Sequence, residues 1–129
     1  MTIQLGVCLA SQITDVDYAV LAEELGFDHL WFADSQMIWS DVYAVMALAA
    51  ARTSRIRIGT GVAVAGTRSV AVTAAAHATI SAIAPGRVFC GIGTGNTAMR
   101  VMATDQCRLP NSSPTSSRFF RCSEDGRRP

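Results

Sequence analysis

Short apolar runs alternate with longer amphipathic segments over the first hundred residues of the chain. The apolar runs are almost unbroken, which predicts strands buried on both faces, and the segments between them carry apolar residues at helical spacing. The predicted strands cover 3–9, 28–33, 56–64 and the run in "GRVFCGIGTGN", residues 86–96, into which Pro85-Gly86 turns the chain, and the predicted helices cover 14–25, 40–52 and 69–84.

Polar and glycine residues mark the expected helix ends. Thr14 and Ser40 are the predicted N-caps of the first two helices, because a hydroxyl oxygen can accept a hydrogen bond from a free amide, and Gly26 ends the first helix. The spacing places these residues on the buried faces: Tyr18, Leu21, Ala22 and Leu25 in the first helix, and Tyr43, Met46, Ala47 and Ala50 in the second.

Regular alternation of strand and helix predicts an α/β fold with parallel strands in chain order and the helices on one face. A doubly wound sheet and a (β/α)8 barrel are the two common folds of this kind, and both bind ligands at the carboxyl ends of the strands. A barrel needs about 250 residues. Four strands and three helices can be counted in the 129 residues of this chain, so a barrel reading implies a truncated one.

The composition changes after residue 102. Residues 103–129 hold three of the four prolines and five of the eleven arginines, and they show no helical or alternating period. We therefore expect one folded segment over 1–102, followed by an irregular C-terminal tail that is disordered or the product of a shifted reading frame.

Composition excludes several function classes. A formal net charge of +1 gives no broad field for binding nucleic acid, and the four widely spaced cysteines form no metal-binding motif. We expect Cys8 and Cys90 to be buried thiols. The amino-terminal sequence lacks the pattern of a signal peptide, and the uncharged stretch 69–86 is too weakly apolar for a membrane span, which predicts a cytoplasmic protein with no membrane partner.

The fourth predicted strand ends in a glycine cluster, Gly91, Gly93 and Gly95, followed by Asn96. Glycine at such a place indicates a positive φ angle or the close approach of another group. A dinucleotide fingerprint would need GxGxxG after the first strand, so that reading is poor. A phosphate cradle at a helix N-terminus fits better, and a plain glycine-rich turn remains the alternative.

Two segments, "GFDHLWFADSQMIWSDVYAVMALAAARTSRIRIGTGV" and "TRSVAVTAAAHATISAIAPGRVFCGIGTGN", resemble the amino-terminal half of the luciferase-like monooxygenase superfamily. The resemblance covers about residues 5–102 and is strongest to the deazaflavin-dependent branch that includes methylenetetrahydromethanopterin reductases. It implies a (β/α)8 barrel of TIM type, here truncated. It also implies hydride transfer between a small organic substrate and a cofactor, with the deazaflavin coenzyme F420 favoured and FMN as the alternative.

The resemblance also implies a set of site residues. Asp34 and Ser35 match a loop where many relatives have Asp-His. Trp39 matches a position where some deazaflavin enzymes have a tryptophan beside the cofactor ring, and a core anchor at the barrel rim is its alternative role. Gly61 and Val62 match a non-prolyl cis peptide that supports the ring, and the Gly-Thr-Gly interruption of this strand independently indicates a bulge or a close approach. The loop after the fourth strand is expected to contact the cofactor through Gly93, Thr94, Gly95 and Asn96, and no metal is expected.

Asp34 and Asn96 are the candidate catalytic residues, each with a competing interpretation. Ser35 stands where many relatives have histidine, so this loop has no imidazole for acid–base chemistry. The competing interpretation is that Asp34 simply caps the next turn. Asn96 stands where relatives often have an acid, and its amide can form hydrogen bonds but cannot exchange a proton near neutral pH.

Two hypotheses on function follow. The first is a luciferase-like oxidoreductase impaired by truncation, and the alternative is a noncatalytic half-barrel remnant or interaction module. In either case the first and fourth strands would be exposed edges, which predicts self-association.

Overall fold

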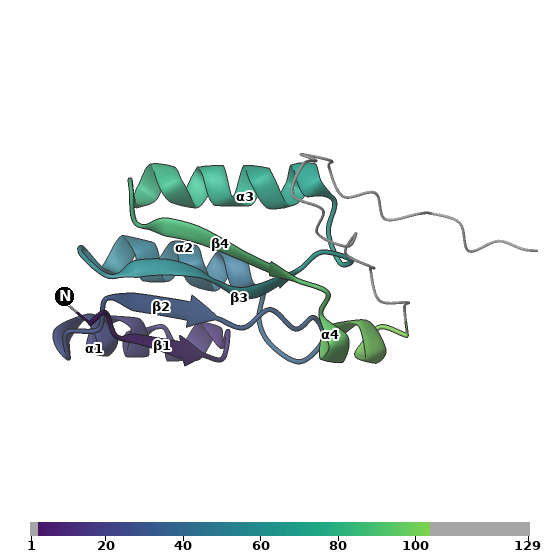
Figure 1. Cartoon of the computed structure of the whole chain (residues 1–129), viewed down its shortest axis with the longest axis horizontal. Coiled ribbons are helices and arrows are strands. Elements are labelled where there is room, and N and C mark those ends of the chain that lie inside the picture. The colour runs from purple at the N-terminus through teal and green to yellow at the C-terminus, as the bar shows by residue number, and fades with distance from the viewer. Residues whose placement is uncertain (1–2, 104–129) are drawn as a thin grey trace, which may run out of the picture.

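The computed structural model describes residues 3–103, which form a four-stranded parallel sheet with helices. The strands are β1 (Gly6–Leu9), β2 (His29–Phe32), β3 (Arg57–Val64) and β4 (Val88–Gly93), and they lie in the order β1-β2-β3-β4 (Figure 1). All three neighbouring pairs are parallel. The predicted strand order and direction are therefore confirmed, and all four carboxyl ends lie at one edge of the sheet.

Three helices connect the strands: α1 (Asp17–Glu24), α2 (Val42–Arg52) and α3 (Val70–Ile83). They share one hydrophobic core with side chains from a single face of the sheet, as predicted. A fourth helix, α4 (Asn96–Val101), follows β4. It is not among the three helices predicted from apolar spacing, although the glycine cluster had indicated a helix N-terminus at this place. Within residues 3–103, no helix is long and apolar enough to cross a membrane. The tail expected over 103–129 lies, beyond Ala103, outside the described residues.

The core forms between the sheet and the helices. Leu30 and Phe32 of β2 and Ile58 of β3 are fully buried there. α2 contributes the largest helical share, with Val42, Tyr43, Val45, Met46, Ala49 and Ala50 buried. Burying each large apolar side chain contributes about 1.5–3 kcal/mol, so packing among β2, β3 and α2 contributes substantially to stability.

The amino-terminal part of α1 differs from the sequence prediction. A 3-10 turn (Ile13–Asp15) precedes the helix and includes Thr14, so the N-cap position falls at Val16 instead. The Thr14 hydroxyl donates to the Asp15 carboxylate at 3.0 Å. The buried residues of α1 are Ala19 and Ala22, whereas Tyr18, Leu21 and Leu25 are exposed. Small side chains let the helix lie close to the sheet, and the larger ones then point away from it. Gly26 does end the helix, with a φ angle of 85°.

The start of α2 is also one residue later than predicted. Asp41, not Ser40, is the N-cap, and its carboxylate accepts hydrogen bonds from the amides of Tyr43 (3.0 Å) and Ala44 (3.1 Å). The Ser40 hydroxyl instead accepts from the amide of Ile13. Of the predicted face, Tyr43, Met46 and Ala50 are buried, while Ala47 is only partly buried.

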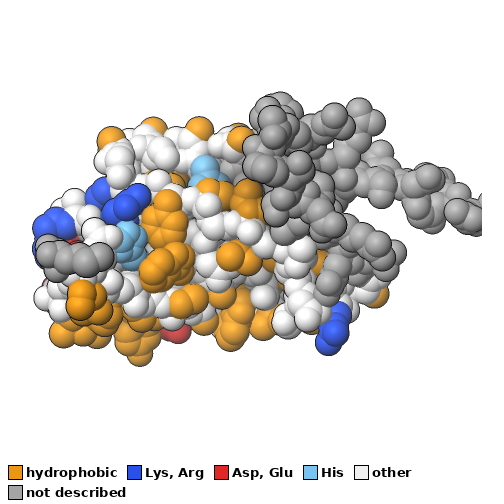
Figure 2. All heavy atoms as spheres, viewed as in Figure 1, with side chains coloured by type: hydrophobic (Ala, Val, Ile, Leu, Met, Phe, Trp, Pro, Cys, Tyr) orange, Lys and Arg blue, Asp and Glu red, His pale blue; other side chains and the backbone are white. Residues whose placement is uncertain are grey.

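The opposite face of the sheet has no helix over it in the described residues, and hydrophobic side chains gather there (Figure 2). The rings of His29, Trp31 and Phe89 cluster on this face, with centroids 5.7–5.8 Å apart. Cys8, in register with Trp31, and Cys90, on the outer strand β4, are both exposed. The expectation of two buried thiols was therefore wrong, because each cysteine lies where only a further layer or strand would cover it.

The turn that leads from α2 into β3 is held at the amino-terminal edge of the sheet. The Glu23 carboxylate accepts hydrogen bonds from the amides of Ser54, Arg55 and Ile56 at 2.6–3.1 Å. Arg87 reaches the same turn from the other side and donates to the carbonyls of residues 50, 53 and 56 and to the Thr53 hydroxyl. These two side chains satisfy amides and carbonyls that would otherwise lack partners.

Candidate functional site

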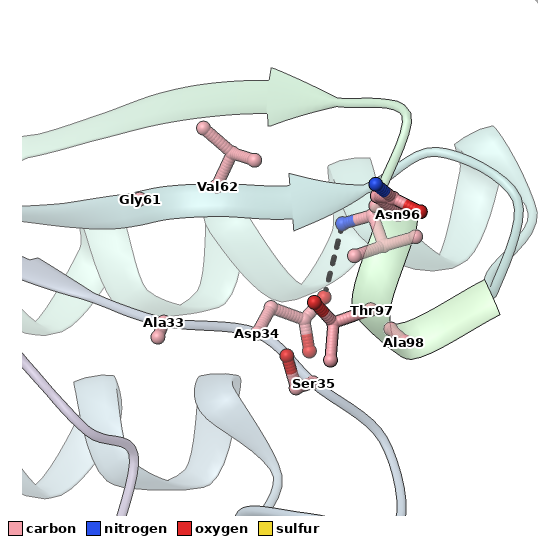
Figure 3. A pocket seen from close by; sticks show the side chains of 10 residues that line it. Ala33, Asp34, Ser35, Gly61, Val62, Asn96, Thr97 and Ala98 are labelled. Carbon is pink, nitrogen blue, oxygen red and sulfur yellow. Dashed lines mark hydrogen bonds between the residues drawn. The ribbon is translucent and has the colours of Figure 1, made fainter. Parts of the chain in front are cut away.

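An open pocket of about 200 Å³ lies at the carboxyl edge of the sheet (Figure 3). Six of the predicted site residues line it: Asp34, Ser35, Gly61, Val62, Gly95 and Asn96. Ala33, Val64, Thr97 and Ala98 complete the lining. Trp39, Gly93 and Thr94 do not line the pocket, although each lies within four residues of one that does. Residues far apart in the sequence therefore meet where parallel strands end, as the fold predicts.

β3 forms one wall of the pocket. The Gly61–Val62 peptide bond is cis, as predicted. The pairing of β3 with β4 shifts register between Thr60 and Ala63, which confirms the irregularity expected from the Gly-Thr-Gly interruption. Val62 is 42% exposed and presents an apolar surface to the pocket.

The glycine cluster is explained largely by the close approach of β3. A Cβ atom on Gly93 would lie 2.5 Å from Cγ2 of Val62, and one on Gly95 would overlap the side chain of Val64. Gly95 also has a φ angle of 70°, which other residues rarely adopt. The approaching group that the glycines indicate is thus, at least in part, the chain's own neighbouring strand.

Asp34 is buried at the end of β2 and its carboxylate is fully engaged. It accepts hydrogen bonds from the Val64 amide at 3.1 Å, from Nε2 of Gln36 at 2.6 Å and from Nη1 of Arg68 at 2.7 Å. Figure 3 shows the bond to the Val64 amide crossing from the loop after β2 to the end of β3. The carboxylate therefore joins two walls of the pocket.

Arg68 is the residue of this network whose role the sequence did not indicate. Its guanidinium pairs with Asp34 and, through Nη2, with Asp41 at 2.8 Å, and it lies 4.9 Å from the centroid of the Tyr43 ring. Burial alone would lower the pKa of Arg68, but the two carboxylates raise it above its usual value. Burial alone would raise the pKa of Asp41, yet the bonds from Arg68 and from backbone amides lower it. An arginine just before the Ser69 N-cap of an apolar helix is the only sequence signal for this role.

α4 supplies the third wall. Ala98 and Met99 pack on Val64, and this contact places Asn96 and Thr97 beside the pocket. Ser35, Asn96 and Thr97 contribute neutral polar side chains to the lining, and no Arg or His from residues 3–103 lines the pocket. In the same part of the chain, no three His, Cys, Asp or Glu side chains lie close enough to hold a metal ion. The arrangement suits a flat neutral group held by hydrogen bonds and apolar contacts.

Comparison with known proteins gives a consistent picture. The family model described as luciferase-like monooxygenase matches residues 13–105. The chain is 40% identical over 81 residues to the 5,10-methylenetetrahydromethanopterin reductase of Methanolobus tindarius, an alignment that covers 63% of this chain and 24% of the relative. It is 45% identical over 87 residues to the F420-dependent glucose-6-phosphate dehydrogenase of Kineococcus radiotolerans, covering 61% and 26% of the two chains.

A solved structure shows the same fold. The coenzyme F420-dependent tetrahydromethanopterin reductase from Methanopyrus kandleri superposes with a TM-score of 0.73 and 29% identity, over 80% of this chain and 30% of that one. This likeness identifies the sheet as an arc of a TIM-type parallel (β/α) barrel, so the predicted fold class is confirmed. The chain spans about a quarter of the length of the curated relatives it matches.

Proposed function

This chain belongs to the luciferase-like monooxygenase family, and from that premise we propose that it forms one wall of the cofactor site of an oxidoreductase. The reaction is hydride transfer between a small organic substrate and a deazaflavin, coenzyme F420, with FMN as the alternative cofactor. The observation that carries the proposal is that six residues matched to the family's site line one pocket at the carboxyl edge. When bound, the cofactor supplies the ring that gives or takes the hydride.

The residues of the pocket fit the ring of such a cofactor. Val62 offers an apolar surface, and the Ser35 hydroxyl and Asn96 amide offer hydrogen-bonding groups for a ring edge. A volume of about 200 Å³ is below the roughly 300–1,000 Å³ of complete ligand sites, so these residues supply part of the contact. The pocket offers no cationic side chain from the described residues, and the proposal therefore concerns the ring and not the phosphate-bearing tail.

The two candidate catalytic residues take different roles in this proposal. Asn96 contacts the bound cofactor or substrate through its amide, which orients a reacting group without exchanging a proton. Asp34 already accepts three hydrogen bonds and is 6% exposed, so it holds the pocket walls in position. The proton balance of the reaction then depends on the substrate or on residues outside this chain.

Cofactor titration of the full chain tests the proposal. We expect coenzyme F420 and FMN each to quench or shift in fluorescence on binding, weakly in both cases because the pocket is open. The Ala33→Leu variant, which places a larger side chain in the pocket lining, should weaken binding about tenfold, which corresponds to the loss of ~1.4 kcal/mol.

The matched control is Ala78→Leu, the same change at an exposed position of α3 away from the pocket. It should leave the affinity unchanged. Equal binding by Ala33→Leu and the original chain would refute the assignment of the pocket. Absence of binding by the original chain at millimolar cofactor would favour the noncatalytic alternative.

We also propose that the chain self-associates through the outer strands. β1 and β4 each have one neighbour in the described sheet, and Leu5, Tyr18 and Leu25 are more than half exposed beside β1. Unpaired strand edges next to apolar surface favour association between copies. Sedimentation analysis should show dimers or larger species, and a single monomeric species at high micromolar concentration would contradict this.

A further inference from the structure

We infer that Arg68 is a positioning residue that holds the loop between β2 and α2 against the pocket. The inference rests on the proposed function, because it concerns the wall that this loop gives to the cofactor site. The inference explains what holds the loop in position, a question that the family match and the predicted site residues do not address.

Arg68 binds both ends of the same loop. The loop between β2 and α2 covers residues 33–41. Asp34 is its second residue, and Asp41 is its last. Nη1 of Arg68 contacts Asp34 at 2.7 Å and Nη2 contacts Asp41 at 2.8 Å, so one guanidinium fixes the separation of the two ends. Ser35 and Trp39, two predicted cofactor contacts, lie between them.

The loop is compact between these two anchors. The amides of Ile38 and Trp39 both donate to the carbonyl of Ser35, at 3.2 and 3.0 Å, which forms a turn. Met37, at the tip, is 85% exposed. The turn lies between the two carboxylates that Arg68 binds, and the Ser40 hydroxyl, which accepts from the Ile13 amide, adds a contact near its second end.

The environment of Arg68 favours a guanidinium over an ammonium group. Its side chain is 15% exposed, its face lies over the Tyr43 ring, and two separate nitrogens are needed for two carboxylates. A planar fork with several donors meets these requirements, whereas the single ammonium of lysine cannot reach both carboxylates in the same geometry.

The network extends to the β3 wall of the pocket. Asp34 also accepts a bond from the Val64 amide, two residues beyond Val62, and Val64 packs against Ala98 and Met99 of α4. We therefore expect a change in the Asp34–Arg68 pair to alter the positions of the ends of β2 and β3 and of α4. Arg68 itself does not line the pocket and acts only through these contacts.

Hydrogen exchange of the full chain, without cofactor, tests the anchoring. In the Arg68→Lys variant we expect exchange of the hydrogen-bonded amides of Ile38, Trp39 and Val64 to accelerate about tenfold or more, the range expected for loss of a charge-assisted hydrogen bond. Amides of β1 and α1 should keep their original rates. Arg52→Lys is the matched control, because Arg52 forms an exposed pair with Asp17 and should change nothing in the loop.

A second variant keeps the test independent of any loss of folding caused by altering Arg68. Asp41→Asn retains an N-cap of nearly equal quality and removes only the charge that pairs with Arg68. We expect faster exchange at the amides of Ile38 and Trp39, with the first turn of α2 unchanged. Combining it with Arg68→Lys should add little further acceleration, because both changes break the same contact.

Cofactor titration separates failure of this inference from failure of the proposed function. If the original chain binds coenzyme F420 or FMN, Arg68→Lys should weaken that binding several-fold while the Arg52→Lys control does not. Unchanged loop exchange in both variants would overturn the anchoring role, as would acceleration spread evenly over the core. Faster loop exchange with unaltered cofactor affinity would overturn the link to the cofactor wall. If the original chain binds neither cofactor, the proposed function fails, and loop exchange alone decides on Arg68.

Discussion

Replacing Glu23 by glutamine should destabilise the chain in a manner that depends on pH. Its carboxylate accepts hydrogen bonds from three consecutive amides and from the Ser54 hydroxyl. Burial alone would raise the pKa of Glu23, but the bonds from Ile56, Arg55 and Ser54 lower it from 4.5 to about 2. Glutamine keeps one acceptor oxygen and loses the charge.

The magnitude follows from linkage between proton binding and folding. A lowering of this size corresponds to an upper limit of ~3.4 kcal/mol at ~1.36 kcal/mol per pKa unit. Glu23 is only partly buried, and solvent screening reduces this limit to on the order of 1–2 kcal/mol. Because the folded-state pKa is the lower one, the contribution is complete above pH ~5 and disappears as pH falls toward 2. Less than half of it should remain at pH 3.

Urea unfolding of the original chain and of Glu23→Gln at several pH values between 3 and 7 measures the effect. We expect the difference in unfolding free energy to be largest at pH 6–7 and to shrink to less than half at pH 3. Glu24→Gln is the control, since Glu24 is its exposed neighbour on the same helix. A difference that stays constant with pH, or one no larger than that of the control, would refute the reasoning.

Three further substitutions test other contacts. Arg87→Gln should lower the unfolding free energy by ~2–4 kcal/mol, measured by urea unfolding, because four hydrogen bonds to the turn before β3 are lost. Met37→Gly should raise the unfolding free energy by up to ~1 kcal/mol, because Met37 has a φ angle of 65°, which glycine adopts with less strain. The thermal unfolding midpoint should therefore rise slightly, and a lower midpoint would contradict this. Gly93→Ala should cost ~1–3 kcal/mol through contact with Val62, and Val62→Ala in the same chain should recover part of that loss; strict additivity of the two changes would argue against the contact.

The order and direction of the strands could be predicted because they depend on patterns repeated along the whole chain. Mainly apolar runs such as 56–64 favour burial on both faces of the sheet, and the predicted helices between them favour parallel pairing. Helix ends were less predictable, because several residues compete for one position. Asp41 caps α2 in place of Ser40 since its carboxylate reaches two amides at once, and the 3-10 turn at Ile13 displaces the cap expected at Thr14.

Some residues of the candidate site could likewise be predicted from the sequence, and others could not. Residues that directly follow strands, such as Asp34 and Asn96, could be placed together because parallel strands end at one edge. Arg68 could not be assigned, because its importance comes from two carboxylates seven residues apart and from a tyrosine ring beneath it, a three-dimensional coincidence without a motif. Similarly, the sequence showed that Gly93 and Gly95 admit a close neighbour, but not that the neighbour is β3.

The match between strand order and chain order has a consequence for synthesis on the ribosome. Each strand pairs with the strand made just before it, so every pairing in the described sheet needs only one intervening strand–helix unit of chain. Each strand–helix unit can therefore dock as soon as it leaves the exit tunnel, without waiting for a distant segment to be translated. A nascent chain of this topology extends its sheet in one direction, and we expect pulse proteolysis of stalled intermediates to show protection that grows unit by unit from β1 toward β4.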